Sequence, residues 1–235
     1  LGSAQVRIEV GGEVWVVSGD YKRDDDPSCA PFEVVRCDVF VTETTFADPR
    51  YQWPASGSAS AEIHAWWMQN RAEQQASLLF CYALGKTQRV LAELRQHCDD
   101  TVYLHGTMTQ LVSLYRQAGI AMLPTQAVTQ CVASHDFRGA LVLVPPSVFG
   151  TPWLKRLAPY RTGFASGWMG VDNGRAQRYD RGFTLSDHAD WPSLLRTIEE
   201  TGARRVLTMH GDSTLLLQTL RERGIDAAAL DSSSY

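Results

Sequence analysis

The sequence is poor in cysteine and lacks the patterns that make cysteine a metal ligand or a cross-link. Its 235 residues contain five cysteines and no Cys-x-x-Cys pair. Cys37 and Cys81 lie in or beside apolar runs. An odd number of scattered cysteines favours buried free thiols in a reducing compartment over disulfides or a zinc knuckle. We therefore expect a cytoplasmic protein.

Long hydrophobic runs and a signal peptide are also absent from the sequence. No apolar stretch approaches the roughly 20 residues that a membrane span requires. We therefore expect no membrane partner. The composition, 44% hydrophobic and 20% charged, is that of an ordinary globular protein with enough apolar side chains for a core.

The first residues do not read as the start of a domain. Leu1 stands where Met is expected, and Gly2-Ser3-Ala4 leads directly into a strand-like run at 6–10. Gly11-Gly12 then forms a two-residue turn into a second run at 13–17, which predicts a hairpin. We interpret the chain as beginning inside a longer protein. A leftover Gly-Ser cloning sequence is the alternative.

Short apolar runs alternate with helical patterns along the rest of the chain. Strands are predicted at 39–43, 77–82, 101–104, 140–144, 163–166, 183–185 and 204–209, and helices at 59–74, 84–97, 107–118, 191–201 and 213–223. Alternation of this kind indicates an α/β protein with a largely parallel sheet covered by helices.

Four polar side chains are expected at the ends of four strands, where reacting groups collect in layered α/β folds. They are Asp20, Glu43, His188 and His210. Imidazole at a strand end suits a metal, so His210 is a candidate ligand, with a helix-start hydrogen bond as the alternative. Asp20 is either a turn residue or a carboxylate that bridges two metals. Glu43 is either part of the site or a cap for the following segment.

His188 is a candidate general acid. Asp187 and Asp190 flank it, and their carboxylates are expected to fix its tautomer and raise its pKa. A structural hydrogen bond is the alternative. The pattern of the four side chains is typical of a hydrolytic enzyme.

Charge is distributed unevenly although the net charge is only −4. Residues 151–181 hold six Lys and Arg against two Asp, a net charge of +4, and the remainder of the chain carries −8. Guanidinium groups bind phosphate oxygens in pairs, so this basic segment suits a phosphate-bearing substrate, with a solvated loop as the alternative. Gly85-Lys86-Thr87 lacks the first glycine of a P-loop, which excludes ATP binding by that motif. The same Gly-Lys pair at a helix start is still a candidate phosphate site.

Six short motifs together resemble a known family. They are Ser18-Gly-Asp-Tyr21, Thr42-Glu-Thr-Thr-Phe46, Tyr82-Ala-Leu-Gly-Lys-Thr-Gln88, Ala165-Ser-Gly-Trp-Met169, Leu185-Ser-Asp-His-Ala-Asp190 and Thr208-Met-His-Gly211. Their order is similar to that in metallo-β-lactamase-fold nucleases with an inserted β-CASP domain. Within that group the chain most resembles the bacterial exonucleases associated with a DNA ligase and a helicase in the DNA-damage response. It is more distantly similar to the endonuclease that cleaves messenger RNA precursors at their 3′ ends.

The resemblance implies an α/β fold, the C-terminal part of a metallo-β-lactamase αβ/βα sandwich with an inserted β-CASP α/β domain. Residues 1–45 and 181–235 would form the metallo-β-lactamase core and 46–180 the insertion. Asp20 matches the carboxylate that bridges two metal ions and His210 a ligand of the second metal. His188 matches the residue that protonates the leaving oxygen, and Glu43 the acidic residue that supports it. Substrate contacts are expected from Lys86, Ser166, Gly167, Arg175, Arg178 and Arg181.

The departure from the family is the missing signature His-x-His-x-Asp-His, together with a further histidine expected just before Leu1. Two ligands cannot hold a zinc pair, because zinc takes about four, with three from protein even in open catalytic sites. We therefore expect the chain alone to be inactive and the intact protein to bind two Zn²⁺, with Mn²⁺ as an alternative. The expected activity is metal-dependent phosphodiester hydrolysis in DNA repair, by an exonuclease with a DNA ligase and a helicase as partners. An RNA-processing nuclease and a non-catalytic nucleic-acid-binding scaffold are the competing interpretations.

Overall fold

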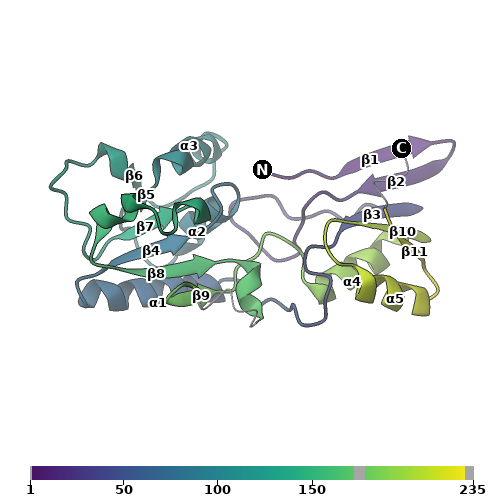
Figure 1. Ribbon diagram of the computed structural model, residues 1–235. Coiled ribbons are helices and arrows are strands. Elements are labelled where there is room, and N and C mark those ends of the chain that lie inside the picture. Colours follow the sequence, from purple (N-terminus) through teal and green to yellow (C-terminus); the bar gives the residue numbers. More distant parts are fainter. Residues whose placement is uncertain (1, 172–177, 231–235) are drawn as a thin grey trace. The chain divides into compact units, whose positions relative to one another are not determined.

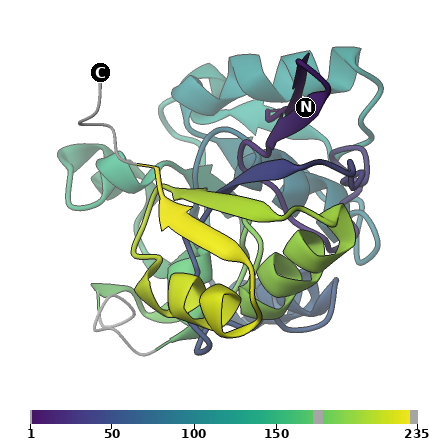
Figure 2. The same ribbon diagram turned by 90° about the vertical axis from the view of Figure 1, so that its right-hand side faces the viewer.

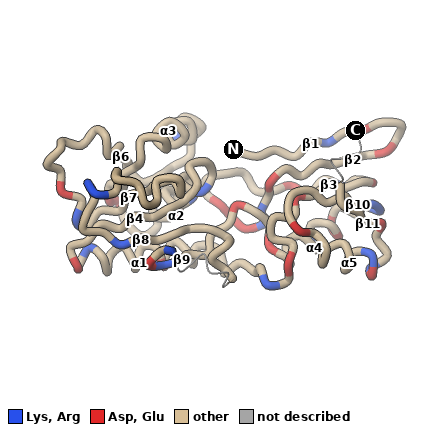
Figure 3. The backbone as a smooth tube through the Cα atoms, viewed as in Figure 1, with Lys and Arg blue, Asp and Glu red and all other residues tan. Residues whose placement is uncertain are grey.

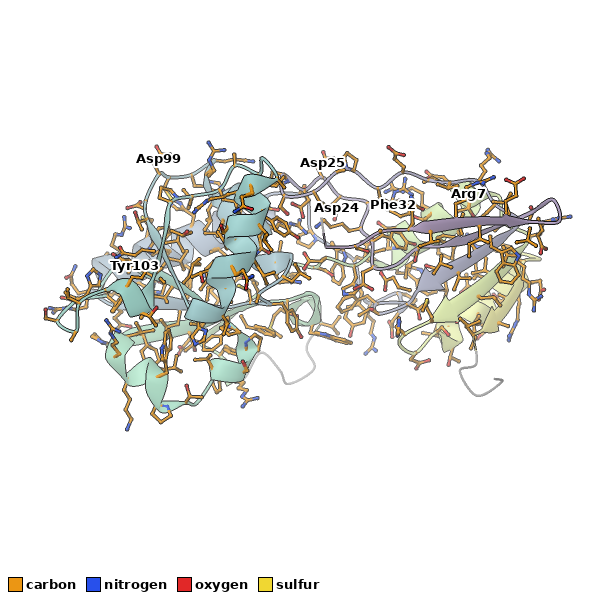
Figure 4. All side chains as sticks on the ribbon, turned by 90° about the horizontal axis from the view of Figure 1, so that it is seen from above. Arg7, Asp24, Asp25, Phe32, Asp99 and Tyr103 are labelled. Carbon is orange, nitrogen blue, oxygen red and sulfur yellow. The ribbon has the colours of Figure 1, made fainter. Side chains whose placement is uncertain are left out.

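The computed structural model describes residues 2–171 and 178–230, and the chain divides into two compact units (Figure 1). The parallel-sheet unit consists of Asp25–Ala30 and Pro54–Ser186. The mixed-sheet unit consists of Gly2–Asp24, Pro31–Trp53 and the chain from Asp187 onward. Figure 4 labels Asp99 and Tyr103 in the first of these units and Arg7 and Phe32 in the second.

Both units are α/β structures in which most strands run parallel, which confirms the predicted class. The chain changes unit after Asp24, Ala30, Trp53 and Ser186, whereas the sequence segments were predicted to change at 45/46 and 180/181. Assignment of the units to a metallo-β-lactamase core and a β-CASP insertion stays a prediction. Within the described residues, no helix is both long enough and apolar enough to span a membrane.

The parallel-sheet unit is built on six parallel strands in the order β6-β5-β7-β4-β8-β9. Its central strands read as continuous apolar runs because both of their faces are buried. The strands are β4 (Ala76–Phe80), β5 (Val102–Leu104), β6 (Thr125–Ala127), β7 (Leu141–Val144), β8 (Tyr160–Ala165) and β9 (Arg181–Phe183). The helices are α1 (Ser58–Ala72), α2 (Lys86–Leu94) and α3 (Thr109–Gln117), and the short 3₁₀ helices are η1 (Gly106–Met108), η2 (Val128–Gln130), η3 (Pro146–Val148), η4 (Pro152–Leu157) and η5 (Gly167–Gly170).

Alternate residues of these strands face two different cores. One core joins the sheet to α1, α2 and α3, and the other joins it to the segments around η3 and η4. Gly163 shows how closely the first core is packed. A Cβ atom at this position would lie 2.8 Å from the Phe183 ring and 3.1 Å from the Trp66 ring. A larger residue in the middle of β8 would therefore displace two aromatic side chains.

Arg89 of α2 is a buried cation that joins distant segments of the parallel-sheet unit. Its Nε donates to Glu93 Oε1 at 2.6 Å and lies 3.8 Å from Asp26 Oδ2. Its Nη1 donates to the carbonyl oxygen of Ser186 at 2.7 Å. The Arg89, Asp26 and Glu93 side chains are each at most 6% exposed. The segment 25–30, α2 and the end of the unit at Ser186 are thus held by one guanidinium.

The mixed-sheet unit has five strands in the order β1-β2-β3-β10-β11, of which only β1 runs antiparallel to its neighbour. The strands are β1 (Val6–Val10), β2 (Glu13–Val17), β3 (Val39–Glu43), β10 (Arg205–Met209) and β11 (Asp226–Ala229). Helices α4 (Trp191–Thr201) and α5 (Thr214–Glu222) pack on one face of this sheet, as Figure 2 shows. Asp190 caps α4 by accepting from the Ser193 N–H at 3.0 Å, and Gly202 ends it at φ 67°.

The opposite face of the mixed sheet is a second apolar surface. The strand register aligns Val6, Val17, Val41 and Leu207 across it. Its centre is buried, but on β1 Val6, Ile8 and Val10 are 53%, 46% and 70% exposed. Among the described residues of this unit, both helices lie on the other face. The unit therefore presents an apolar sheet edge of a kind that usually marks an interaction surface.

Most predicted elements are present, and the hairpin at 6–10 and 13–17 and the helix at 191–201 have the predicted bounds. Two strands were missed. The β6 strand is short and polar, and β11 consists of Asp-Ala-Ala-Ala, a composition that favours helix. Pairing with β5 and β10 overrides these local preferences. The strand predicted at 183–185 has the wrong bounds, because β9 ends at Phe183. β9 pairs with β8 and so belongs to the parallel sheet.

The buried Arg89 network predicts an unequal response to two arginine substitutions. Arg89→Ala removes the buried guanidinium that lies beside the Asp26 and Glu93 carboxylates and should lower the free energy of unfolding by about 3–5 kcal/mol. The control Arg138→Ala removes an ion pair with Asp136 whose side chains are 52% and 55% exposed, and should cost about 1 kcal/mol or less. Urea unfolding monitored by tryptophan fluorescence measures both. Equal losses would show that the network does not support the unit.

Candidate functional site

The carboxyl ends of three neighbouring strands meet at one edge of the mixed sheet. β2, β3 and β10 are adjacent and parallel, so they all end on the same side (Figure 2). Asp20 follows the end of β2, Glu43 is the last residue of β3 and His210 follows the end of β10. All three belong to the same unit. The fold thus brings these predicted site residues to one sheet edge.

Hydrogen bonds between the strand ends hold this edge rigidly. The Ser18 N–H donates to the Val41 carbonyl oxygen at 2.9 Å, and the Glu43 N–H donates to Ser18 Oγ at 3.2 Å. On the other side of β3, the N–H and the hydroxyl of Thr44 donate to the His210 carbonyl oxygen at 3.2 and 2.8 Å. The segments that carry Asp20 and His210 are therefore both tied to β3.

His210 sits in an unusual backbone conformation at this edge. Its φ of 58° lies in the left-handed region, which non-glycine residues adopt rarely and mostly at functional sites. A Cβ atom at the next residue, Gly211, would lie 2.6 Å from the Thr44 carbonyl oxygen. The close approach of two backbones thus requires glycine there. The side chains of His210 and Asp20 are both exposed, as solvent-accessible ligands or contacts should be.

Glu43 is the buried acid of the site. Glu43 is only 1% exposed. Its Oε2 accepts a hydrogen bond from the Thr45 N–H at 2.8 Å, and its Oε1 accepts one from the Ala189 N–H at 3.3 Å. His188 Nδ1 lies 3.5 Å from Glu43 Oε2, an ion-pair distance when the imidazole is protonated. The carboxylate therefore caps its own following segment and also fixes the loop that carries His188.

His188 lies in the loop between β9 and α4, which corrects the prediction that it ends a strand. Its carbonyl oxygen accepts from Trp53 Nε1 at 2.8 Å, and its ring meets the Phe46 ring edge-on at 5.8 Å. A quarter of its side chain is exposed.

Of the two aspartates that flank His188, Asp190 is used to cap a helix. Asp190 caps α4 and accepts from the Trp53 N–H at 2.9 Å. Asp187 lies 3.7 Å from Lys22 Nζ. The acid that contacts the His188 imidazole is Glu43, which is distant in the sequence. Sequence proximity misled the prediction because Asp190 is recruited by the helix start.

Tyr21 and Trp53 support the site and were not identified from the sequence. The Tyr21 ring stacks on Phe32 at 4.5 Å and its hydroxyl lies 3.4 Å from Thr42 Oγ1. Burial raises the pKa of Tyr21 above its ordinary value of about 10. Tyr21 therefore anchors the segment directly after Asp20. Its position next to the Ser-Gly-Asp turn was the one signal for this role.

A third acid, Asp212, lies two residues after His210 at the same strand end. Hydrogen bonds from the backbone and hydroxyl of Thr214 lower the pKa of Asp212, and the nearby Asp48 opposes that shift. The edge is therefore acidic. Within the part of the chain that the structure describes, however, no three His, Cys, Asp or Glu side chains form a group able to hold a metal. Asp20 and His210 alone do not fit a zinc ion, which takes at least three protein ligands.

The predicted substrate-binding residues that the structure describes lie in the parallel-sheet unit. Lys86 begins α2 and is buried, with its Nζ 5.6 Å from the centre of the Tyr82 ring. Ser166 and Gly167 are buried and begin η5, and the Trp168 N–H contacts Ser166 Oγ at 3.4 Å. Arg175 lies outside the described residues.

The two remaining basic candidates are exposed. Arg178 lies over the Phe149 ring at 4.6 Å. Arg181 lies over the Phe183 ring at 5.4 Å and 3.9 Å from Glu62 Oε2. Figure 3 shows basic positions along β8 and β9, as the charge pattern of 151–181 predicted. A role of these residues in substrate binding stays a prediction.

The position of Glu43 predicts a loss of stability on truncation. Glu43→Ala removes the acceptor of the Thr45 and Ala189 N–H groups and should lower the free energy of unfolding by about 1–3 kcal/mol. The exposed carboxylate of Asp20 is the control, and Asp20→Ala should change stability by about 0.5 kcal/mol or less. Urea titrations of both variants provide the test, and an unchanged midpoint for Glu43→Ala would contradict the assigned role.

The raised pKa of Tyr21 predicts a pH-dependent stability. Above pH about 10 the tyrosine of the unfolded chain ionises while the buried phenol stays protonated, so the free energy of unfolding falls as the pH rises. The contribution is fully present below pH 10 and should decline by up to about 1.4 kcal/mol per pH unit above it. Tyr21→Phe should remove this part of the slope. Identical slopes for the two proteins between pH 9 and 11 would contradict it.

Comparison with known proteins gives one sequence relative and a structural likeness. No family model matches the chain. It is 35% identical over 233 residues, 98% of its length, to a protein of Opitutus terrae named "Probable DNA ligase". The chain spans only 22% of that protein. The fold is similar to the crystal structure of a protein of unknown function from Enterococcus faecalis V583, with a TM-score of 0.60 and 12% sequence identity. The alignment covers 97% of this chain and 59% of that chain.

Proposed function

We propose that the chain is a module of a DNA-processing protein. The observation that carries this proposal is the 35% identity over nearly the whole chain to a protein named as a probable DNA ligase. A segment similar to this chain lies in that polypeptide, of which it makes up 22%. Occurrence in one polypeptide with a ligase supports a function on the same substrate, DNA. An ATP-dependent DNA ligase and a helicase are proposed as partners from the family resemblance of the six motifs.

The finer proposal is hydrolysis of phosphodiester bonds by an exonuclease of the metallo-β-lactamase fold with a β-CASP insertion. Its support is the edge where Asp20, Glu43 and His210 lie at the ends of adjacent parallel strands, with His188 held by Glu43 at 3.5 Å. Asp20 and His210 would contribute two metal ligands, and Zn²⁺ or Mn²⁺ would supply Lewis-acid chemistry. These two residues do not complete a metal site by themselves, because zinc takes at least three protein ligands.

The apolar face of the mixed sheet supports the same fold. One face of this sheet is covered by α4 and α5, and the other presents Val6, Ile8 and Val10 on β1. An αβ/βα sandwich places a second sheet on such a face. We propose that the remaining ligands and the second sheet come from sequence outside this chain.

The part of the reaction that this chain's residues would perform is proton transfer. In the hydrolysis, a water oxygen forms a bond to phosphorus and the bond to the departing ribose oxygen breaks. His188 is proposed to donate a proton to that oxygen, with Glu43 at Nδ1 stabilising the protonated imidazole. The proton released by water restores the imidazolium. Positioned general acids contribute about 10²–10⁴-fold to such steps.

A second candidate is a non-catalytic nucleic-acid-binding module. It is favoured by one observation, that the described residues contain no group of three or more His, Cys, Asp and Glu able to hold a metal. The basic stretch 151–181 would then bind the backbone without cleaving it. An RNA-processing nuclease of the same fold shares every feature of the first proposal except its substrate.

The test uses the polypeptide encoded by the full coding sequence that contains this chain. Labelled single-stranded DNA and RNA of one sequence are incubated with it and Zn²⁺ or Mn²⁺, and bound metal is counted by mass spectrometry. We expect hydrolysis of DNA. His188→Ala should lower the rate about 10²–10⁴-fold with metal retained, and His210→Ala should lose metal.

Three results separate the candidates. Full rate and full metal content in both variants would overturn the assigned roles. Faster cleavage of RNA than of DNA would favour the RNA-processing nuclease. Binding of either strand without cleavage by the intact polypeptide would favour the non-catalytic module.

A further inference from the structure

We propose that the carboxyl edge of the parallel sheet carries a base-stacking site for single-stranded nucleic acid, centred on Tyr82. This inference rests on the proposed DNA-processing function and deepens it, because it names the form of the substrate and a contact to its bases. It adds Tyr82 and Phe149 to the expected phosphate contacts.

The site lies where three adjacent strands end. β7, β4 and β8 are neighbours and parallel, so their carboxyl ends lie on one side of the sheet. The connection from β4 to β5 contains α2 and packs on one face of the sheet. The connection from β7 to β8 contains η3 and η4 and packs on the opposite face. Neighbouring strands whose connections leave to opposite faces form the usual ligand-binding position of parallel α/β sheets.

Exposed aromatic surface marks this edge. Tyr82 follows β4 by two residues and is 50% exposed, and Leu84 beside it is 47% exposed. At half exposure, the Tyr82 ring presents aromatic surface to solvent at this edge. Behind it, Tyr179 packs against the Phe80, Phe149 and Phe164 rings at 5.2, 4.9 and 4.9 Å. Burial raises the pKa of Tyr179, Arg178 opposes that shift, and the nearby Tyr82 adds to it.

Cations accompany both outer rings. Lys86 Nζ lies 5.6 Å from the centre of the Tyr82 ring, and the Arg178 guanidinium lies 4.6 Å from that of Phe149. Arg178 is exposed and available to a phosphate oxygen. Lys86 is buried, so Arg178 is the accessible one of these two cations. Exposed aromatic surface near an accessible cation is a combination by which proteins bind single strands, since bases stack on the rings and the backbone follows the charge. A duplex cannot use such a site, because its bases are already stacked on one another.

Binding is tested by fluorescence anisotropy in EDTA, which removes metal and prevents cleavage. The probes are a labelled single strand of about 12 nucleotides, an abasic strand of the same length and charge, and a duplex. Tyr82→Ala should weaken binding of the ordinary strand about 5- to 100-fold and leave the abasic strand and the duplex unchanged. Tyr82→Phe keeps the ring and should bind as the unaltered chain does. Circular dichroism checks that each variant is folded.

The outcomes distinguish the inference from the proposed function. Equal binding of ordinary and abasic strands by the unaltered chain, or an unchanged affinity in Tyr82→Ala, would overturn the stacking site even if the intact polypeptide cleaves DNA. Selective loss in Tyr82→Ala would support the site even if no hydrolysis is found. Tighter binding of the duplex than of the single strand would also contradict it.

Discussion

The buried carboxylate of Glu43 is the interaction on which the candidate site depends. It stands at the end of β3, accepts hydrogen bonds from Thr45 and Ala189, and lies against the His188 imidazole. A buried carboxylate is stable only where such donors surround it. Its position therefore fixes the loop after β9 to the edge of the mixed sheet. Asp20 and His210 are fixed to the same strand by backbone hydrogen bonds on either side.

The two units share one structural feature, an edge at which parallel strands end, but carry different side chains there. Parallel strands gather their carboxyl ends at one edge, and each edge carries the side chains that the local sequence offers. The mixed-sheet edge carries Asp20, Glu43 and His210, for which roles in proton transfer and metal binding are proposed. The parallel-sheet edge offers Tyr82, Arg178 and the Phe149 ring, which suit a nucleic-acid strand. The proposed function assigns the chemistry to the first edge and the holding of the strand to the second.

The sequence was most informative where local pattern and tertiary structure agree. The apolar runs that end at Glu43 and Met209 are buried central strands, so the residues that follow them could be placed at a sheet edge. His188 could not be placed in this way, because the apolar run before it belongs to the other sheet. Its partner is separated from it by more than a hundred residues, whereas the adjacent Asp190 is used as a helix cap. The Asp-Trp-Pro-Ser sequence that starts α4 carried the signal for that cap. Strand β11 and the exposed Tyr82 ring depend on tertiary packing that no local sequence pattern reveals.

Asp20 and His210 are proposed to bind one metal ion together with ligands from outside this chain. Anomalous diffraction at the zinc absorption edge, from zinc-grown crystals of the polypeptide encoded by the full coding sequence, tests it most directly. We expect a zinc ion with an Asp20 carboxylate oxygen and a His210 imidazole nitrogen each at about 2.0–2.2 Å. A zinc ion bound by neither residue, or by only one of them, would contradict it.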